Sequence, residues 1–188
     1  MAKLRKVSHT LTSTAGVLRM SILALALCLA TPVLAQNAAT PANGEQLAAT
    51  VRDTRAAAER GDASAQYHLG VLYLQGWGVT QDDAQSVSWF RKAADQGNAK
   101  SQYNLGWMYE NGLCVTRDAA QAASWYSKAA EQGLSGAQNN LAMMYANGEG
   151  VTRDDAKAIS WWRKAADQGN TDALEALHKM EASGRSRR

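Results

Sequence analysis

The chain has 188 residues, of which 46% are hydrophobic and 20% charged, and these proportions are typical of a globular protein rather than a disordered one. With only two prolines, the sequence is neither that of a collagen nor that of a proline-rich linker. The formal charge of +3 is compatible with nucleic-acid binding until the position of the charge along the chain is considered.

Residues 1–35 have the features of a secretory signal peptide. Four basic side chains and no acidic one lie in this segment, and an apolar run covers residues 22–30. Val33 and Ala35 stand where signal peptidase requires small side chains, so we expect cleavage after Ala35. The apolar run is shorter than the ~20 residues that span a bilayer. We therefore expect a periplasmic or secreted protein with no membrane span after cleavage, the alternative being an uncleaved signal anchor.

Most of the basic balance lies at the two ends of the chain. Without residues 1–35 the formal charge falls from +3 to −1, because four cations and no anion leave. Three of the remaining cations are in the last four residues, namely Arg185, Arg187 and Arg188. A nucleic-acid binder needs a clustered basic face to neutralise phosphates. The body of this chain has none, and no phosphate-binding loop, so we expect no nucleic-acid partner.

The body of the sequence consists of three consecutive copies of one repeat unit. Residues 61–96, 97–132 and 133–168 align without a gap at a period of 36 residues. The segments before and after the repeats resemble half-units that close the array. We therefore expect a flexible tail over 36–43, an N-terminal capping helix over 44–60, a C-terminal capping half-repeat over 169–183 and a basic tail over 184–188.

Each unit predicts two helices, helix A and then helix B. Helix A is expected to end at a glycine, because glycine enters the left-handed region without strain; these are Gly76, Gly112 and Gly148. Helix B is expected to begin after an aspartate that caps free backbone N–H groups; these are Asp82, Asp118 and Asp154. Gln85 and Gln121 stand three residues after their caps and predict a capping box.

Small and large residues recur together in the units. Helix A carries a small residue in each unit on which an aromatic ring could lie, and these are Gly70, Gly106 and Ala142. The bulk is expected from two aromatic rows, namely Trp89, Trp125 and Trp161 with Tyr73, Tyr109 and Tyr145. Large residues against small ones make a dense core. We interpret the aromatic rows as core rather than as a sugar or cofactor site.

The recurring residues resemble the Sel-1-like repeat, a 36-residue relative of the tetratricopeptide repeat. The resemblance rests on residues such as Leu69, Gly70, Tyr73, Trp89 and Gly97 in the first unit and on their counterparts in the other two. It implies an all-α fold, a right-handed α-solenoid of helix pairs. It also implies that helix A lines a concave face, that the protein is an adaptor or scaffold for other proteins, and that bacterial members are often exported.

The exported protein has a single cysteine. Cys28 leaves with the signal peptide, and Cys114 stands in a loop where the other units have Gly78 and Gly150. If that position requires a positive φ, the side chain costs on the order of 1 kcal/mol. Cys114 is either a small buried apolar residue or the site of a disulfide-linked dimer.

No residue pattern predicts catalysis, and we expect no enzyme activity, metal or cofactor. His68 and His178 have no partner at the spacing of metal ligands. Exported, cysteine-rich relatives carry a disulfide in each repeat and have been linked to penicillin binding. This chain lacks the cysteine pairs and any Ser-x-x-Lys arrangement, so that link does not transfer.

Recognition is expected at helix-A positions that differ between the units yet share one helical face. These are Tyr67, His68, Val71, Tyr103, Asn104, Trp107, Asn139, Asn140 and Met143. Amide side chains such as Asn104 and Asn140 could pair with the backbone of an extended peptide. The alternatives are that these residues only face solvent or support packing, that Trp77 and Trp107 bind peptidoglycan or another envelope glycan, or that the protein is a weak hydrolase.

Overall fold

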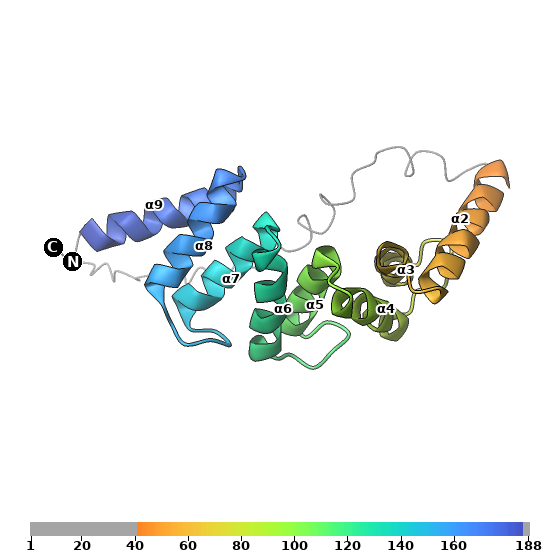
Figure 1. Ribbon diagram of the computed structural model, residues 1–188, viewed down its shortest axis with the longest axis horizontal. Coiled ribbons are helices and arrows are strands. Elements are labelled where there is room, and N and C mark those ends of the chain that lie inside the picture. Colours follow the sequence, from red (N-terminus) through yellow and green to blue (C-terminus); the bar gives the residue numbers. More distant parts are fainter. Residues whose placement is uncertain (1–40, 186–188) are drawn as a thin grey trace, which may run out of the picture. The chain divides into compact units, whose positions relative to one another are not determined.

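The computed structural model describes residues 41–185, with side chains over 44–182. The predicted signal peptide and the outer parts of both tails lie outside the described residues. The described segment consists of helices that follow one another along the chain (Figure 1): α2 Pro41–Glu59, α3 Ala63–Gln75, α4 Asp83–Asp95, α5 Ala99–Asn111, α6 Ala119–Glu131, α7 Ser135–Asn147, α8 Asp155–Asp167 and α9 Thr171–Arg185.

The helices form a stack in which each contacts the next. Helices α3, α5 and α7 are the A helices of the three units, and α4, α6 and α8 are the B helices. Every A helix packs on the B helix of its own unit, and every B helix packs on the helix that follows, which is α9 in the case of α8. No strand occurs in residues 41–185. The contacts between successive helices assign the described part of the chain to the α-solenoid class, as predicted.

The helix ends have the predicted caps. Gly76, Gly112 and Gly148 follow the A helices with φ between 67° and 70°, and their N–H groups bond back into the last turn. Each B helix begins after an aspartate whose carboxylate accepts from a backbone N–H of the first turn. The capping box is only half formed, because the Asp82 N–H donates instead to the carbonyl of Tyr73 at 3.0 Å. That bond ties the loop to the end of helix α3.

The ring that lies on the small residue of helix A is not the tryptophan of helix B but the residue after it. Gly70 faces Phe90 and Gly106 faces Tyr126, so closely that a methyl group on Gly106 would lie 2.6 Å from the tyrosine ring. In the third unit Ala142 and Trp162 share one buried cluster. The prediction of a ring on a small residue is therefore confirmed, and the rings are those of Phe90, Tyr126 and Trp162, all at most 4% exposed.

The predicted tryptophan row covers the edge of the core instead of filling it. Trp89 and Trp161 are half-buried and Trp125 is 9% exposed. A lysine three residues later places its ammonium group 3.9–4.0 Å from each ring centre. These are cation–π contacts. The row thus packs against the core, as predicted, but the more deeply buried rings are those of Phe90, Tyr126 and Trp162.

A buried glutamine in each A helix joins three helices. Gln102 Nε2 donates to the carbonyl of Ala94 in the preceding B helix at 3.0 Å, and its Oε1 accepts from Gln132 Nε2 at 2.8 Å. Gln66 and Gln138 make the same pair of bonds. Because an unpaired buried amide is costly, this pairing specifies how one unit docks on the next.

Cys114 has the only positive φ among the non-glycine residues that the structure describes. Its φ is 61°, close to the 69° of Gly78 and the 68° of Gly150. Cys114 is exposed at the surface and its thiol contacts Asp83; partial desolvation of the thiol and this carboxylate raise the thiol pKa to about 11. The side chain is therefore neither buried nor a reactive thiolate at neutral pH, and the structure gives no support for a disulfide-linked dimer.

We predict that Cys114→Gly stabilises the protein by about 1 kcal/mol, because glycine adopts the observed φ without a Cβ clash. Chemical denaturation of both proteins measures the difference. Cys114→Ala is the control, because it removes the thiol but keeps the Cβ. Its free energy of unfolding should not rise by a comparable amount. An equal gain in the two variants would assign the effect to the thiol instead of the backbone.

Candidate functional site

Three rows of side chains line one face of the A helices, which we call the helix-A face. Successive residues in each row are 36 positions apart, so they occupy equivalent places on α3, α5 and α7. Two of the rows were predicted, and the sequence analysis missed the third. The rows are His68, Asn104 and Asn140; Val71, Trp107 and Met143; and, the one missed, Gln75, Asn111 and Asn147.

Neighbouring A helices lie close enough for these rows to be continuous. The Lys100 ammonium of α5 lies 5.9 Å from the ring centre of Tyr67 on α3. A methyl group on Gly136 of α7 would lie 3.4 Å from Tyr103 Cε2 of α5, which is ordinary van der Waals contact. A ligand placed along the face could therefore contact several units at once.

The structure places three of the nine predicted binding residues in the core. Tyr67, Val71 and Asn139 are each 7% exposed. Tyr67 packs on Phe90 with 5.9 Å between ring centres, and Asn139 Oδ1 accepts a buried bond of 3.1 Å from Trp162 Nε1. Tyr67 and Asn139 thus contact the ring of helix B, and all three side chains are too buried to meet a partner, so the row of Val71 is open to a ligand only at Trp107 and Met143.

The other predicted residues remain on or near the surface. Met143 is 44% exposed and His68 is exposed, whereas Asn104, Trp107 and Asn140 are half-buried. Partial desolvation of the ring and the nearby Lys100 ammonium lower the pKa of His68, so its imidazole stays largely neutral at pH 7. Tyr103 is half-buried, and its ring lies 5.7 Å from that of Tyr126.

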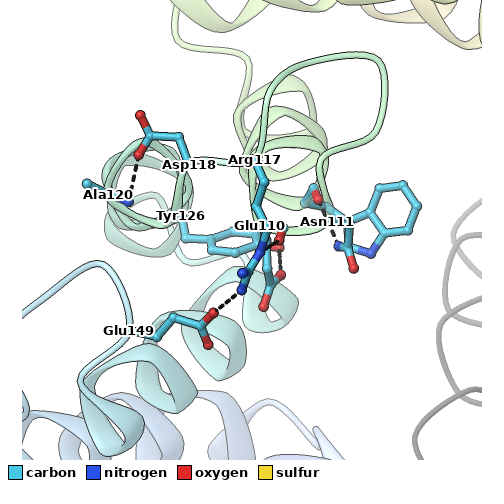
Figure 2. A network of polar contacts seen from close by, with 8 residues as sticks. Glu110, Asn111, Arg117, Asp118, Ala120, Tyr126 and Glu149 are labelled. Carbon is cyan, nitrogen blue, oxygen red and sulfur yellow. Dashed lines mark hydrogen bonds and ion pairs between the residues drawn. The ribbon is translucent and has the colours of Figure 1, made fainter.

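A polar network beside the helix-A face was not predicted. Figure 2 shows the Tyr126 ring directed at Glu110, with Arg117 reaching past it to Glu149. The Tyr126 hydroxyl donates to Glu110 Oε2 at 2.6 Å, and Arg117 forms an ion pair with Glu149 at 2.5 Å. Burial raises the pKa of Glu110, while the bond from Tyr126 opposes the shift. Burial and the Glu110 carboxylate raise the pKa of Tyr126.

This network belongs to the second unit and its junction with the third. The position of Glu110 is occupied by Leu74 in the first unit and by Ala146 in the third. The position of Tyr126 is occupied by Phe90 in the first unit. The hydroxyl and the carboxylate therefore occur together in the second unit, and the first unit has an apolar pair in the same place.

Two kinds of feature are absent from the part of the chain that the structure describes, namely a metal-binding cluster and a membrane-spanning helix. Residues 41–185 hold no group of three or more His, Cys, Asp or Glu side chains that could bind a metal ion. Within that segment, no helix combines the length and apolar character that crossing a membrane requires.

Three consecutive segments, residues 63–98, 99–134 and 135–170, match the Sel1 repeat. Together they cover more than half of the sequence. The chain belongs to the Sel1 repeat family. Members of this family are generally non-catalytic scaffolds for protein–protein interaction. The resemblance inferred from the repeated residues is thus confirmed.

Two solved structures are similar to this Sel1 repeat protein in sequence and fold. One is c5321, a protective antigen present in uropathogenic Escherichia coli strains displaying an SLR fold, with 42% identity over 71% of this chain and a TM-score of 0.69. The match spans only 29% of the length of c5321. The other is a Sel1 repeat protein from Oxalobacter formigenes, with 40% identity, a TM-score of 0.67, and coverage of 69% of this chain and 98% of that one.

A third structure is similar in fold alone. Cysteine rich protein B of Helicobacter pylori shares 24% identity, with a TM-score of 0.55 and coverage of 71% of this chain and 96% of that one. No curated protein matches the sequence.

We predict strong coupling between Tyr126 and Glu110 in a double-mutant cycle. Tyr126→Phe should cost about 1–3 kcal/mol, because it leaves a half-buried carboxylate without its donor. The double variant Glu110→Leu/Tyr126→Phe installs the pair of the first unit and should be close to the wild type in stability. Denaturation of the four proteins at pH 7 measures this, and additive single effects would contradict it.

The same variants should differ in their response to pH. Because the folded state raises the pKa of Glu110, the native protein holds this proton at a higher pH than the unfolded chain, whose value is near 4.5. The contribution of Glu110 to stability is therefore full below pH 4.5 and is lost as the pH rises through the folded pKa. Stability of Glu110→Leu should fall less over that range, and an identical pH profile would contradict the assignment.

Proposed function

We propose that this Sel1 repeat protein is an exported adaptor that binds an extended segment of a partner protein along the helix-A face. The observation that supports the proposal most directly is the combination of side chains on that face. An apolar row that includes Trp107 and the exposed Met143 runs between two rows that are rich in amides. Amides can pair with a peptide backbone in both directions, and exposed apolar side chains can anchor a side chain of the partner.

The distribution of charge supports the same face. The three A helices carry two charged side chains in total, Lys100 and Glu110, whereas the three B helices carry eleven. Charged side chains are expensive to desolvate on binding, and the centres of protein interfaces are depleted in them. The helix-A face therefore suits an uncharged segment better than the B-helix side does.

Export is the second part of the proposal, and it rests on the signal-peptide pattern of residues 1–35. We expect the protein in the periplasmic or secreted fraction with Gln36 as its first residue. Fractionation followed by N-terminal sequencing tests this. A protein that keeps its first residues in the membrane fraction would show the uncleaved anchor instead.

The binding proposal is tested by site-specific photo-crosslinking in cells. A photoreactive side chain at Asn104, on the helix-A face, should link the protein to a defined partner protein. The matched control is the same side chain at Ser88, which is exposed on helix α4. Adding Trp107→Ala to the Asn104 probe should reduce the crosslink severalfold, because it removes the apolar anchor.

Two results would contradict the proposal. Equal crosslinking from Asn104 and Ser88 would show that the helix-A face is not selective. Co-sedimentation with purified cell walls that is lost on Trp77→Ala would favour the envelope-glycan alternative, because Trp77 lies in a loop and is 49% exposed. Circular dichroism of each variant shows whether the helices remain folded.

A further inference from the structure

A hydrogen bond from an arginine to a tyrosine joins successive units at two junctions of the array. Arg55 Nη2 of α2 donates to the Tyr73 hydroxyl oxygen of α3 at 2.9 Å, and Arg91 Nη2 of α4 donates to the Tyr109 hydroxyl oxygen of α5 at 2.6 Å. In both cases the arginine precedes its tyrosine by 18 residues, so the two bonds occupy equivalent places. Each bond ties one helix to the A helix that follows it.

The junction between the second and third units has the tyrosine but a serine in place of the arginine. Tyr145 of α7 follows Ser127 of α6 by the same 18 residues, and it is half-buried like Tyr73 and Tyr109. A serine side chain is too short to take the place of a guanidinium. Its one hydroxyl hydrogen is directed at Glu131, whose Oε1 lies 3.0 Å from Ser127 Oγ. At this junction Ser127 therefore cannot supply the bond that an arginine supplies at the other two.

The surroundings of Tyr145 suit a cation. The bond from Ser127 holds the Glu131 carboxylate beside the point from which the arginine side chain starts at the other junctions. A guanidinium carries five N–H donors in one plane, so it can bond to a tyrosine oxygen and pair with a carboxylate at the same time. The Lys157 ammonium lies 5.1 Å from the centre of the Tyr145 ring, but it also forms an ion pair of 3.6 Å with Asp154.

This cluster lies away from the helix-A face. Tyr145 stands two residues after Met143 and two residues before Asn147, which belong to that face. Residues two positions apart on an α-helix point about 200° apart around the helix axis. Tyr145 is therefore on the other side of α7, and a ligand bound there need not contact the three rows.

We propose that Ser127, Glu131 and Tyr145 form a binding site for an arginine side chain of a partner protein. The guanidinium donates to the Tyr145 hydroxyl oxygen and pairs with the Glu131 carboxylate. It thereby supplies to this junction the bond that Arg55 and Arg91 make at the other two. The inference goes beyond the proposed function, because it assigns a second site on another side of the array and requires an exposed arginine in the partner.

The test uses linear peptides of about twelve residues, selected from a random library on the full wild-type chain and counter-selected on Ser127→Arg. That variant places a guanidinium of the chain itself beside Tyr145, as at the other junctions, so it should exclude the ligand. We expect the selected peptides to share an arginine. Citrulline has nearly the same shape but no charge, and at this position it should weaken binding about tenfold, as for the loss of a charge-assisted bond.

Matched variants locate the site. Tyr145→Phe should weaken the binding of these peptides about tenfold, because the ring then lacks its acceptor oxygen. Tyr109→Phe is the control, because Arg91 already occupies the equivalent place, and the affinity should stay within twofold of the wild type. Trp107→Ala should also stay within twofold, because Trp107 belongs to the helix-A face. Circular dichroism shows whether each variant remains folded.

Three results would overturn the inference. The first is selected peptides that tolerate citrulline at every arginine, and the second is equal affinity for the wild type and Tyr145→Phe. The third is a loss of binding in Trp107→Ala as large as that in Ser127→Arg. It would place the peptides on the helix-A face, so that the proposed function would stand without the second site.

Discussion

The structure depends on one steric constraint. In each unit an aromatic ring of helix B packs directly against a small residue, glycine or alanine, of helix A. At Gly70 and Gly106 the ring lies so close that a methyl group could not be added without displacement. This contact sets the distance and rotation of the two helices, and the buried glutamines then join one pair to the next. The rows of the helix-A face are aligned because this geometry repeats at every 36 residues.

The polar end of the ring links the fold to the proposed site. Phe90 has no polar end, and its neighbour on helix A is Tyr67. Tyr126 brings a hydroxyl that bonds Glu110, and Trp162 brings an indole N–H that bonds Asn139. Buried polar atoms are usually hydrogen-bonded. A unit whose ring carries a hydroxyl or an indole N–H therefore also has a side chain on helix A that accepts a hydrogen bond from it. Units that are equal in backbone thus differ in the side chains that they can offer to a partner.

The sequence predicted the repeats, the helix ends and the position of the strained Cys114, because each is a local signal that occurs at a fixed spacing. It did not decide which of two adjacent aromatic residues enters the core, because neighbouring helix positions are about 100° apart and both rows are aromatic. For the same reason the sequence did not separate the exposed residues of the proposed binding face from the buried residues beside them. Tyr67 and Asn139 occupy equivalent positions but differ in identity, because each contacts a different ring of helix B. Variation between units alone therefore does not show whether a residue serves packing or recognition.

The polar network around Glu110 was beyond sequence reasoning, because its members come from two helices and two loops that meet only when the units pack. Glu110 and Glu149 stand 39 positions apart in the sequence, yet both act on Arg117. A single signal was visible in advance: Glu110 is a lone acidic residue in A helices that are otherwise nearly uncharged.

The stability of Gly106→Ala against Gly136→Ala tests the central constraint most directly. Both changes replace a helical glycine, which favours folding by up to about 1 kcal/mol through helix propensity. Only the first places a methyl group on a ring, 2.6 Å from Tyr126 against 3.4 Å from Tyr103 for the second. We predict that Gly106→Ala loses about 1–3 kcal/mol while Gly136→Ala is neutral or more stable than the wild type. Equal stabilisation by both would contradict the account.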